Sequence, residues 1–235
     1  EKIVRNTFKR IIVIDDLAER PHDCDILINQ NYSKNAESRY TKLIPNSCKL
    51  FIGPRYSLLP SQYSIQRKIF QDYDGEVKRA LVFFGGSDSH NITSLALNAL
   101  IDPRLSHLHV DVVIGSNNQN KRQLKNIVSS RLNIKSYELL PNLADLITQA
   151  DLAIGATGIS VWERMCLGLP SIIISTAENQ KPAAEALSSS NLVEYLGDYS
   201  EIEKGLLSLK ILELINKPKH LQEMSRRSQI EVDGQ

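Results

Sequence analysis

The chain alternates short runs of β-branched and aliphatic residues with longer stretches in which apolar residues recur at helical spacing. Such alternation is typical of parallel α/β structure, in which buried strands are joined by amphipathic helices. The predicted strands are 10–14, 25–29, 49–53, 79–84, 109–114, 134–137, 151–154 and 171–175. The predicted helices are 91–101, 119–131, 143–149, 160–167, 178–188, 200–216 and 219–229.

The more regular part of this pattern begins near Glu76. From there the alternation of predicted strands and helices is long enough for a complete C-terminal Rossmann-like domain, which we predict over residues 76–235. Residues 1–60 hold three predicted strands with few helices between them, so we expect the C-terminal remnant of an N-terminal Rossmann-like domain there. Residues 61–75, with a mixed polar helix, are predicted to be an interdomain linker. We therefore expect a sequence that is cut short at both ends, more severely at the first.

Composition narrows the functional classes. The 235 residues are 42% hydrophobic, enough for a sizeable core, and the 28 basic and 27 acidic residues nearly balance. Such a balance gives no electrostatic basis for binding nucleic acid or an anionic membrane. Three widely spaced cysteines, without paired metal-ligand spacing, favour structural thiols in a reducing compartment. With no membrane-length apolar run and no signal-peptide pattern, we expect a cytoplasmic protein without a metal site.

Two glycine-containing loops follow predicted strands and precede predicted helices. One begins at Gly85 and Gly86, and the other spans residues 155–160. At the carboxyl edge of a parallel sheet, glycines let the backbone approach a ligand, and the helix start offers free N–H groups to an anion such as a diphosphate. The same glycines are also ordinary turn and helix-entry residues, and the local sequence leaves both interpretations open.

Glu163 has two interpretations as well. With Ser160 it fits a capping box, in which the serine caps the helix and the glutamate bonds back to the N–H of the cap. Alternatively, its carboxylate accepts hydrogen bonds from ribose hydroxyls beside the phosphate loop. The local pattern alone favours the cap.

Asn179 and Gln180 follow the predicted strand 171–175 at the same edge of the sheet. Their amides can orient a water molecule or hold sugar hydroxyls without changing protonation state, or they can simply begin the next helix. Asp15 and Asp16, at the end of the first predicted strand, are interpreted as turn and cap residues. None of the five histidines has metal-ligand spacing.

Several segments, taken in their order along the chain, form a recognisable set: 13–18 (VIDDLA), 20–25 (RPHDCD), 53–59 (GPRYSLL), 84–88 (FGGSD) with Asn91, 150–158 (ADLAIGATG), 162–164 (WER), 168–170 (GLP) and 178–180 (ENQ). Together they resemble the UDP-sugar hydrolase family of pseudaminic acid biosynthesis, whose members have a GT-B type α/β fold of two Rossmann-like domains. The second half also resembles GT-B glycosyltransferases of peptidoglycan lipid assembly.

The resemblance implies a reaction. Members of that family remove UDP from UDP-2,4-diacetamido-2,4,6-trideoxy-β-L-altropyranose by inverting attack of water at the anomeric carbon, and they need no metal or cofactor. The expected partner is therefore a UDP-sugar, and Asn179 is the residue expected to orient the water or the sugar. The implied binding residues are Leu140 (backbone, to uracil), Glu163 (ribose), Gly158, Ile159 and Ser160 (diphosphate), Asn179 and Gln180 (sugar and attacking water), and Gly85 and Gly86 (the cleft facing the other domain).

The sequence departs from the family in one respect that bears on activity. The general base of the family is a histidine in a G-x-G-H-x-x-R loop, and this sequence contains no such loop. We therefore assign no base. Three hypotheses remain: a hydrolase represented by part of its chain, a glycosyltransferase with the same nucleotide site, and a non-catalytic nucleotide-sugar-binding module. The sugar and the oligomeric state are left open.

Overall fold

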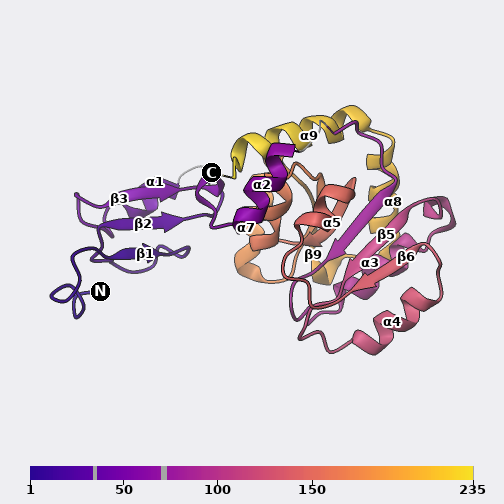
Figure 1. The fold of residues 1–235 in the computed structure, drawn as a ribbon, viewed down its shortest axis with the longest axis horizontal. Coiled ribbons are helices and arrows are strands. Elements are labelled where there is room, and N and C mark those ends of the chain that lie inside the picture. Colours follow the sequence, from indigo (N-terminus) through magenta and orange to yellow (C-terminus); the bar gives the residue numbers. More distant parts are fainter. Residues whose placement is uncertain (34–35, 70–72, 235) are drawn as a thin grey trace.

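The structure is a computed structural model that describes residues 1–33, 36–69 and 73–234, and its strands form two parallel sheets (Figure 1). The small sheet has the order β1-β2-β3, and the large sheet has the order β6-β5-β4-β7-β8-β9. The strands are β1 (Ile12–Ile14), β2 (Ile26–Asn29), β3 (Lys49–Ile52), β4 (Arg79–Phe83), β5 (His109–Val113), β6 (Ile134–Tyr137), β7 (Leu152–Ala156), β8 (Ser171–Ser175) and β9 (Glu194–Asp198).

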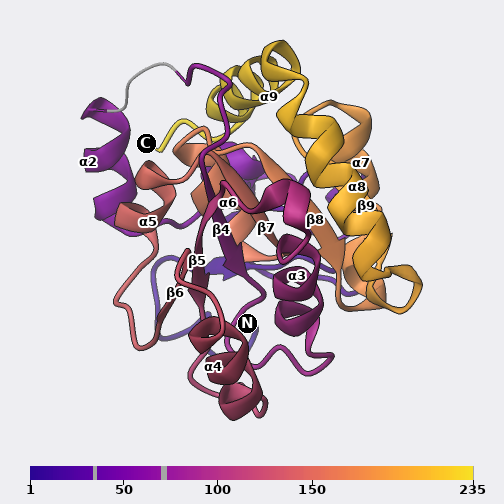
Figure 2. The same cartoon turned by 90° about the vertical axis from the view of Figure 1, so that its right-hand side faces the viewer.

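Helices cover both faces of the large sheet (Figure 2). Because side chains alternate along a strand, Ala80 and Val82 of β4 lie in an apolar cluster with residues of α3, α4 and α8, whereas Leu81 lies in a second cluster with residues of α5, α6 and α7. The helices are α1 (Ala36–Tyr40), α2 (Ser61–Ile69), α3 (Ile92–Leu100), α4 (Lys121–Ser129), α5 (Ala144–Gln149), α6 (Ile159–Cys166), α7 (Lys181–Ser189), α8 (Lys204–Ile215) and α9 (Pro218–Glu231).

The predicted strands are confirmed to within two residues at each end. The strand β9 was not predicted, because its residues are polar or only half-buried and its pairing with β8 is irregular, with Gly197 at a φ of 130°. Two helices begin three or four residues later than predicted, because the short 3₁₀ helices Glu178–Gln180 and Tyr199–Glu201 precede them. The short helix α1 was also missed.

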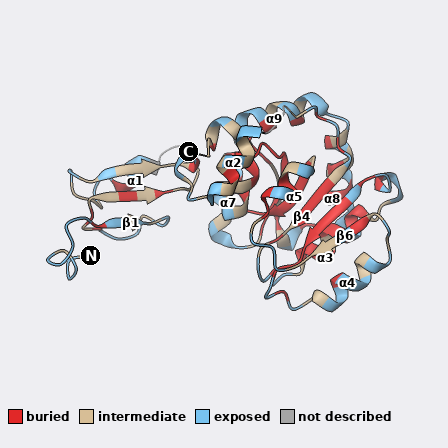
Figure 3. Ribbon diagram, viewed as in Figure 1, coloured by how far each residue is buried: buried red, intermediate tan, exposed pale blue. Residues whose placement is uncertain are grey.

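The two sheets differ in how deeply they are buried (Figure 3). Every residue of β7 and β8 is buried, which explains why these strands are continuous apolar runs. In the small sheet, Leu27 packs into a core with Tyr40, but Ile12 and Ile14 are 59% and 62% exposed. The large sheet is therefore the more rigid platform for a site.

The helix α2 connects the sheets and packs against α5 and α6 of the large one (Figure 1). Its Arg67 donates to the backbone carbonyls of Cys166 and Gln229, near the carboxyl ends of α6 and α9. The division of the chain at residues 60 and 75 stays a prediction, but α2, which is more than half of the segment predicted as a linker, packs on helices of the large sheet. No helix in the described part of the chain has the length and apolarity needed to cross a membrane.

Candidate functional site

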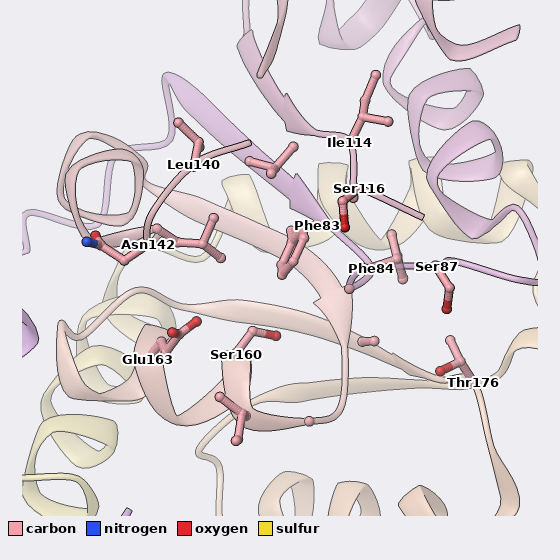
Figure 4. A pocket seen from close by; sticks show the side chains of 18 of the residues that line it. Phe83, Phe84, Ser87, Ile114, Ser116, Leu140, Asn142, Ser160, Glu163 and Thr176 are labelled. Carbon is pink, nitrogen blue, oxygen red and sulfur yellow. The ribbon is translucent and has the colours of Figure 1, made fainter. Parts of the chain in front are cut away.

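A cavity of about 750 Å³ opens at the carboxyl ends of β4, β5 and β7 (Figure 4). Glu163 and Ser160 point from α6 into this space, and Leu140 lies on its opposite side. This is the edge of a parallel sheet at which ligands bind. Of the residues selected from the sequence, those that line the cavity are Gly85, Gly86, Leu140, Gly158, Ile159, Ser160, Glu163 and Gln180.

The helix that follows the first glycine loop is capped at its amino end by a side chain of the protein itself. The carboxylate of Asp88, which is only 6% exposed, accepts hydrogen bonds from the backbone N–H groups of Ile92 (2.8 Å) and Thr93 (3.0 Å) in the first turn of α3. These are N–H groups that a helix leaves without an internal partner. The amino end of α3 is therefore already occupied by an anion.

The second glycine loop is open. Gly158 precedes the first residue of α6, and no side chain among the described residues caps this helix. The N–H groups of Ile159 and Ser160, in the first turn, have no partner inside the helix and border the cavity. Together with the helix dipole they form an anion-binding end, so the two loops that look alike in sequence differ in structure.

The capping-box interpretation of Ser160 and Glu163 is wrong. The N-cap position belongs to Gly158, two residues before Ser160, and Ser160 itself lies within the helix. A serine caps only from the N-cap position, where its hydroxyl can reach the N–H groups ahead of it. Glu163 is thus released from the cap role and lies one turn into the helix, beside the cavity (Figure 4).

The carboxylate of Glu163 is held in a partly apolar environment. Burial raises its pKa above the ordinary value, while the nearby hydroxyl of Tyr63 and the neighbouring charge of Arg164 act in the opposite direction. Tyr63 comes from α2 and was not selected from the sequence. Nothing in its local pattern distinguished it from the other tyrosines between Pro54 and Gly75, because the contact joins residues 100 positions apart.

The buried side chain of Arg164 explains why position 155, the first residue of the second loop, is a glycine. Its guanidinium is fully buried and donates to the backbone carbonyl of Ala156 (3.0 Å), and burial lowers its pKa to about 10. A Cβ atom at Gly155 would lie 2.3 Å from the Nη1 atom of Arg164 and 2.5 Å from the carbonyl oxygen of Phe83. Only glycine fits between the strand and this side chain, so Gly155 serves packing while Gly158 borders the cavity.

A second, smaller cavity of about 290 Å³ lies between the two sheets. Asn179 and Gln180 border it from the large sheet, and Asp16 and Asn31 border it from loops of the small one. Thr157, 5% exposed, lines both cavities, and its buried hydroxyl has no partner among the described residues. Asn179 therefore faces the small sheet and is absent from the first cavity.

The amide of Gln180 is oriented by the backbone. Its Oε1 atom accepts the N–H of Thr176 at 2.9 Å, so the amide NH₂ group is left as the available donor. Gln180 lines both cavities and so lies where they adjoin. Sequence reasoning placed it correctly at the strand edge but could not give this orientation.

None of the five histidines lines either cavity in the described chain. His22 is buried in the small sheet's layer, between the carboxylates of Glu1 (3.0 Å) and Asp15 (3.6 Å). His90 stacks on the ring of Tyr199 at 3.6 Å. Their roles are structural, and no imidazole is placed to accept a proton from a group in these cavities.

Comparison with known proteins identifies relatives of this chain. Residues 80–234 match the model of the glycosyltransferase family 28 C-terminal domain. The UDP-2,4-diacetamido-2,4,6-trideoxy-beta-L-altropyranose hydrolase of Campylobacter jejuni is 26% identical over 83% of this chain and 69% of its own length. The spore coat polysaccharide biosynthesis protein SpsG of Bacillus subtilis is 25% identical over 84% of this chain and 58% of its own length. The resemblance to the pseudaminic acid pathway hydrolases is thus confirmed.

Among solved structures, the calicheamicin glycosyltransferase CalG4 matches with a TM-score of 0.58 at 17% identity, over 89% of this chain and 48% of that chain. The likeness supports the predicted GT-B type fold. The matched part of the chain spans 38% to 69% of the length of three curated relatives, among them the hydrolase and SpsG. With the matched region covering the large sheet and its helices, the chain belongs to the family of the glycosyltransferase family 28 C-terminal domain.

Proposed function

We propose that this chain is the UDP-binding part of a UDP-sugar hydrolase that acts on UDP-2,4-diacetamido-2,4,6-trideoxy-β-L-altropyranose. The observation that carries the proposal is the pairing, in one cavity, of the uncapped amino end of α6 with the carboxylate of Glu163. An anion site next to an acceptor of hydroxyl hydrogen bonds matches a diphosphate attached to a ribose. The likeness to the hydrolase of Campylobacter jejuni supports the choice of substrate.

The diphosphate lies, in this proposal, at the N–H groups of Gly158, Ile159 and Ser160. Each charge-assisted hydrogen bond there contributes roughly 1.5–3 kcal/mol. When water attacks the anomeric carbon, the bond between that carbon and the phosphate oxygen breaks, and the electron pair leaves with UDP. The same N–H groups then stabilise the charge that grows on the leaving phosphate.

The other parts of the substrate follow from the position of the diphosphate. Glu163 accepts the ribose hydroxyls, and the backbone at Leu140 meets uracil on the far side of the cavity. The sugar extends past Gly85 and Gly86 toward the second cavity, where Asn179 and Gln180 orient the sugar and the attacking water. The proton of that water requires a base, and we assign none within these residues. A cytoplasmic location remains a prediction.

A glycosyltransferase is the second candidate, favoured by the family match and by the likeness to CalG4. Such an enzyme would bind the same nucleotide in the same cavity but would transfer the sugar to an acceptor. The two candidates differ in what attacks the anomeric carbon, which lies toward the small sheet, and not in the nucleotide site.

The test is UDP release from the altrose-configured substrate, measured for this chain and for the Campylobacter jejuni hydrolase at equal concentration. We expect this chain to bind UDP but to turn over at least a hundredfold more slowly, because a positioned general base is worth roughly 10²–10⁴ in rate. Failure to bind UDP would reject the proposal, and sugar transfer to an added acceptor would favour the transferase. Comparable turnover would place a base within the chain, with Asp15 and Asp16 the first to test.

A further inference from the structure

The side chain of Arg164 is a buried cation directly behind one wall of the large cavity. It is 2% exposed, and its guanidinium donates to the backbone carbonyl of Ala156 at 3.0 Å. Its Nη1 atom packs against Gly155, which is the partner of Phe83 in the pairing of β7 with β4. Because Phe83 and Ala156 line the cavity, the positive charge lies just behind the backbone that separates it from the proposed ligand.

The position of Arg164 on α6 explains how its charge reaches this place. Long side chains of a helix point back toward the amino end of that helix, which for α6 is the end at Gly158. Glu163 and Arg164 are neighbours in the sequence but diverge in space. The carboxylate of Glu163 points into the cavity (Figure 4), whereas the guanidinium of Arg164 extends beneath the loop that follows β7.

The protein compensates this charge only in part. Within the described chain no carboxylate forms an ion pair with Arg164, and Glu163 acts on it only as a nearby charge. Its Nε atom is buried and has no hydrogen-bond partner among the same residues. Burying a charge without a close counter-ion is costly. A fold that keeps such a cation behind an anion-binding helix end gains from it when an anion binds there.

We propose that Arg164 is a positioning residue for the diphosphate, which fixes the backbone ahead of Gly158 and supplies the buried positive charge that favours a nucleoside diphosphate over the bare nucleoside. The inference rests on the proposed function, since it requires a diphosphate at the amino end of α6. Arg164 touches no ligand in this proposal. Its hydrogen bond holds Ala156, and its charge acts through a thin layer of protein, where attraction between charges is stronger than in water.

Arg67 provides an internal comparison, because it is an arginine with the same kind of partners at the opposite end of α6. It donates to the backbone carbonyls of Cys166, the last residue of α6, and of Gln229 (2.6 Å) and Val232 (3.2 Å). An arginine that only holds backbone carbonyls should affect folding, and should change the affinities of all ligands of the cavity alike. The charge of Arg164 should instead act on ligands that carry phosphate.

Titration of the chain with UDP and with uridine, followed by NMR, tests this inference. The variants are Arg164→Lys, which keeps the charge, and Arg164→Gln, which keeps an amide donor for the carbonyl of Ala156 but removes the charge. Arg67→Gln is the matched control, because it makes the same change at the other end of α6. All titrations are made at a temperature at which thermal unfolding shows each variant to be folded.

We expect the wild type to prefer UDP over uridine, and Arg164→Gln to reduce that preference roughly tenfold, the effect of one unit charge about 10 Å away at an effective dielectric constant of about 20. Arg164→Lys keeps most of the preference. Arg67→Gln leaves it unchanged, even where it lowers the melting temperature. If Arg164→Gln does not fold, the Nε–H signal of Arg164 in the wild type gives the test: UDP should shift it more than the Nε–H signal of Arg67, and uridine should move neither.

An unchanged preference in folded Arg164→Gln, or an Arg164 signal that UDP does not move, overturns the inference and leaves the proposed function standing. Equal losses of UDP and uridine affinity also reject it, because they would show a general structural role. A loss of preference in Arg164→Lys as large as in Arg164→Gln would contradict a role of the charge. A wild type that does not bind UDP, or binds it no better than uridine, overturns the proposed diphosphate site together with the inference.

Discussion

The amino ends of α3 and α6 look alike in the sequence and differ in the structure. Each follows a buried strand and a glycine loop at the same edge of the large sheet. At α3 the protein supplies its own anion, since the carboxylate of Asp88 bonds two N–H groups of the first turn. At α6 the preceding residue is Gly158, and no described side chain takes that place. Of these two helix ends, the one after Gly158 is therefore free to bind an anion, whereas the one after Asp88 is not.

The largest effect is expected from giving α6 the kind of anion that α3 has. Gly158 has an extended φ of 176°, and a Cβ atom there would meet nothing within 4 Å, so Gly158→Asp is sterically allowed. Its carboxylate would cap the helix and repel the diphosphate. Losing two charge-assisted hydrogen bonds weakens UDP binding by roughly a hundredfold or more, measured by calorimetry.

The matched control for that variant is Gly86→Asp. It lines the same cavity and has equally open space, but it lies beside the end that Asp88 already fills. We expect a much smaller loss of UDP affinity than for Gly158→Asp. Equal losses in both variants would mean that the diphosphate does not distinguish the two helix ends.

The next largest effect on UDP affinity is expected from removing Glu163, the proposed acceptor of the ribose hydroxyls. Glu163→Ala should weaken UDP binding about tenfold, the effect of one hydrogen bond to a charged group. Because Glu163 takes no part in a cap, the free energy of unfolding should not fall by the usual cap penalty of about 1 kcal/mol, and the melting temperature should stay nearly the same. A lowered melting temperature with unchanged UDP affinity would assign Glu163 a structural role only.

Removing the protein's own anion from α3 should act on stability and not on binding. Asp88→Ala is expected to lower the free energy of unfolding by about 1–2 kcal/mol, because two buried N–H groups lose their acceptor. Asp88→Asn keeps an acceptor oxygen and tolerates the φ of 44° at this position, so it should lose less. Urea denaturation measures the first effect, and calorimetry should find UDP affinity nearly unchanged in both variants.

The smallest effect concerns the pH dependence of stability. Burial raises the pKa of Glu163 in the folded state, so this group favours folding at pH values below its unfolded pKa and loses that contribution as the pH rises through the folded pKa. Glu163→Gln removes the titration. The stability of this variant relative to the wild type should therefore increase as the pH rises from about 4 to 7. A constant difference across that range, measured by urea denaturation, would contradict a raised pKa.

Much of the fold could be predicted because the large sheet is regular. The fully buried runs in β7 and β8 and the helical spacing in α3 report burial directly. The polar edge strand β9 and the short α1 could not be predicted, since their apolar pattern is too weak. The local sequence pattern could not decide whether Glu163 belongs to a helix cap or binds a ligand.

The site was predictable to the extent that it lies at strand ends. Gly158 and Gln180 follow strands of one sheet, so their meeting at one cavity follows from the parallel topology. The contact between Tyr63 and Glu163 depends on how α2 packs on α6, which no local pattern encodes. The capping-box error has the same origin, because the start of α6 is set by where β7 ends and its chain turns.

Backbone amide chemical shifts in a ¹⁵N-labelled chain, followed as UDP is added, show directly which helix end binds the diphosphate. We predict the largest shifts at the N–H groups of Ile159 and Ser160, with those of Ile92 and Thr93 nearly unchanged because they stay hydrogen-bonded to Asp88. Large shifts at Ile92 and Thr93, with Ile159 and Ser160 unaffected, would show that the diphosphate binds at α3 and would contradict this prediction.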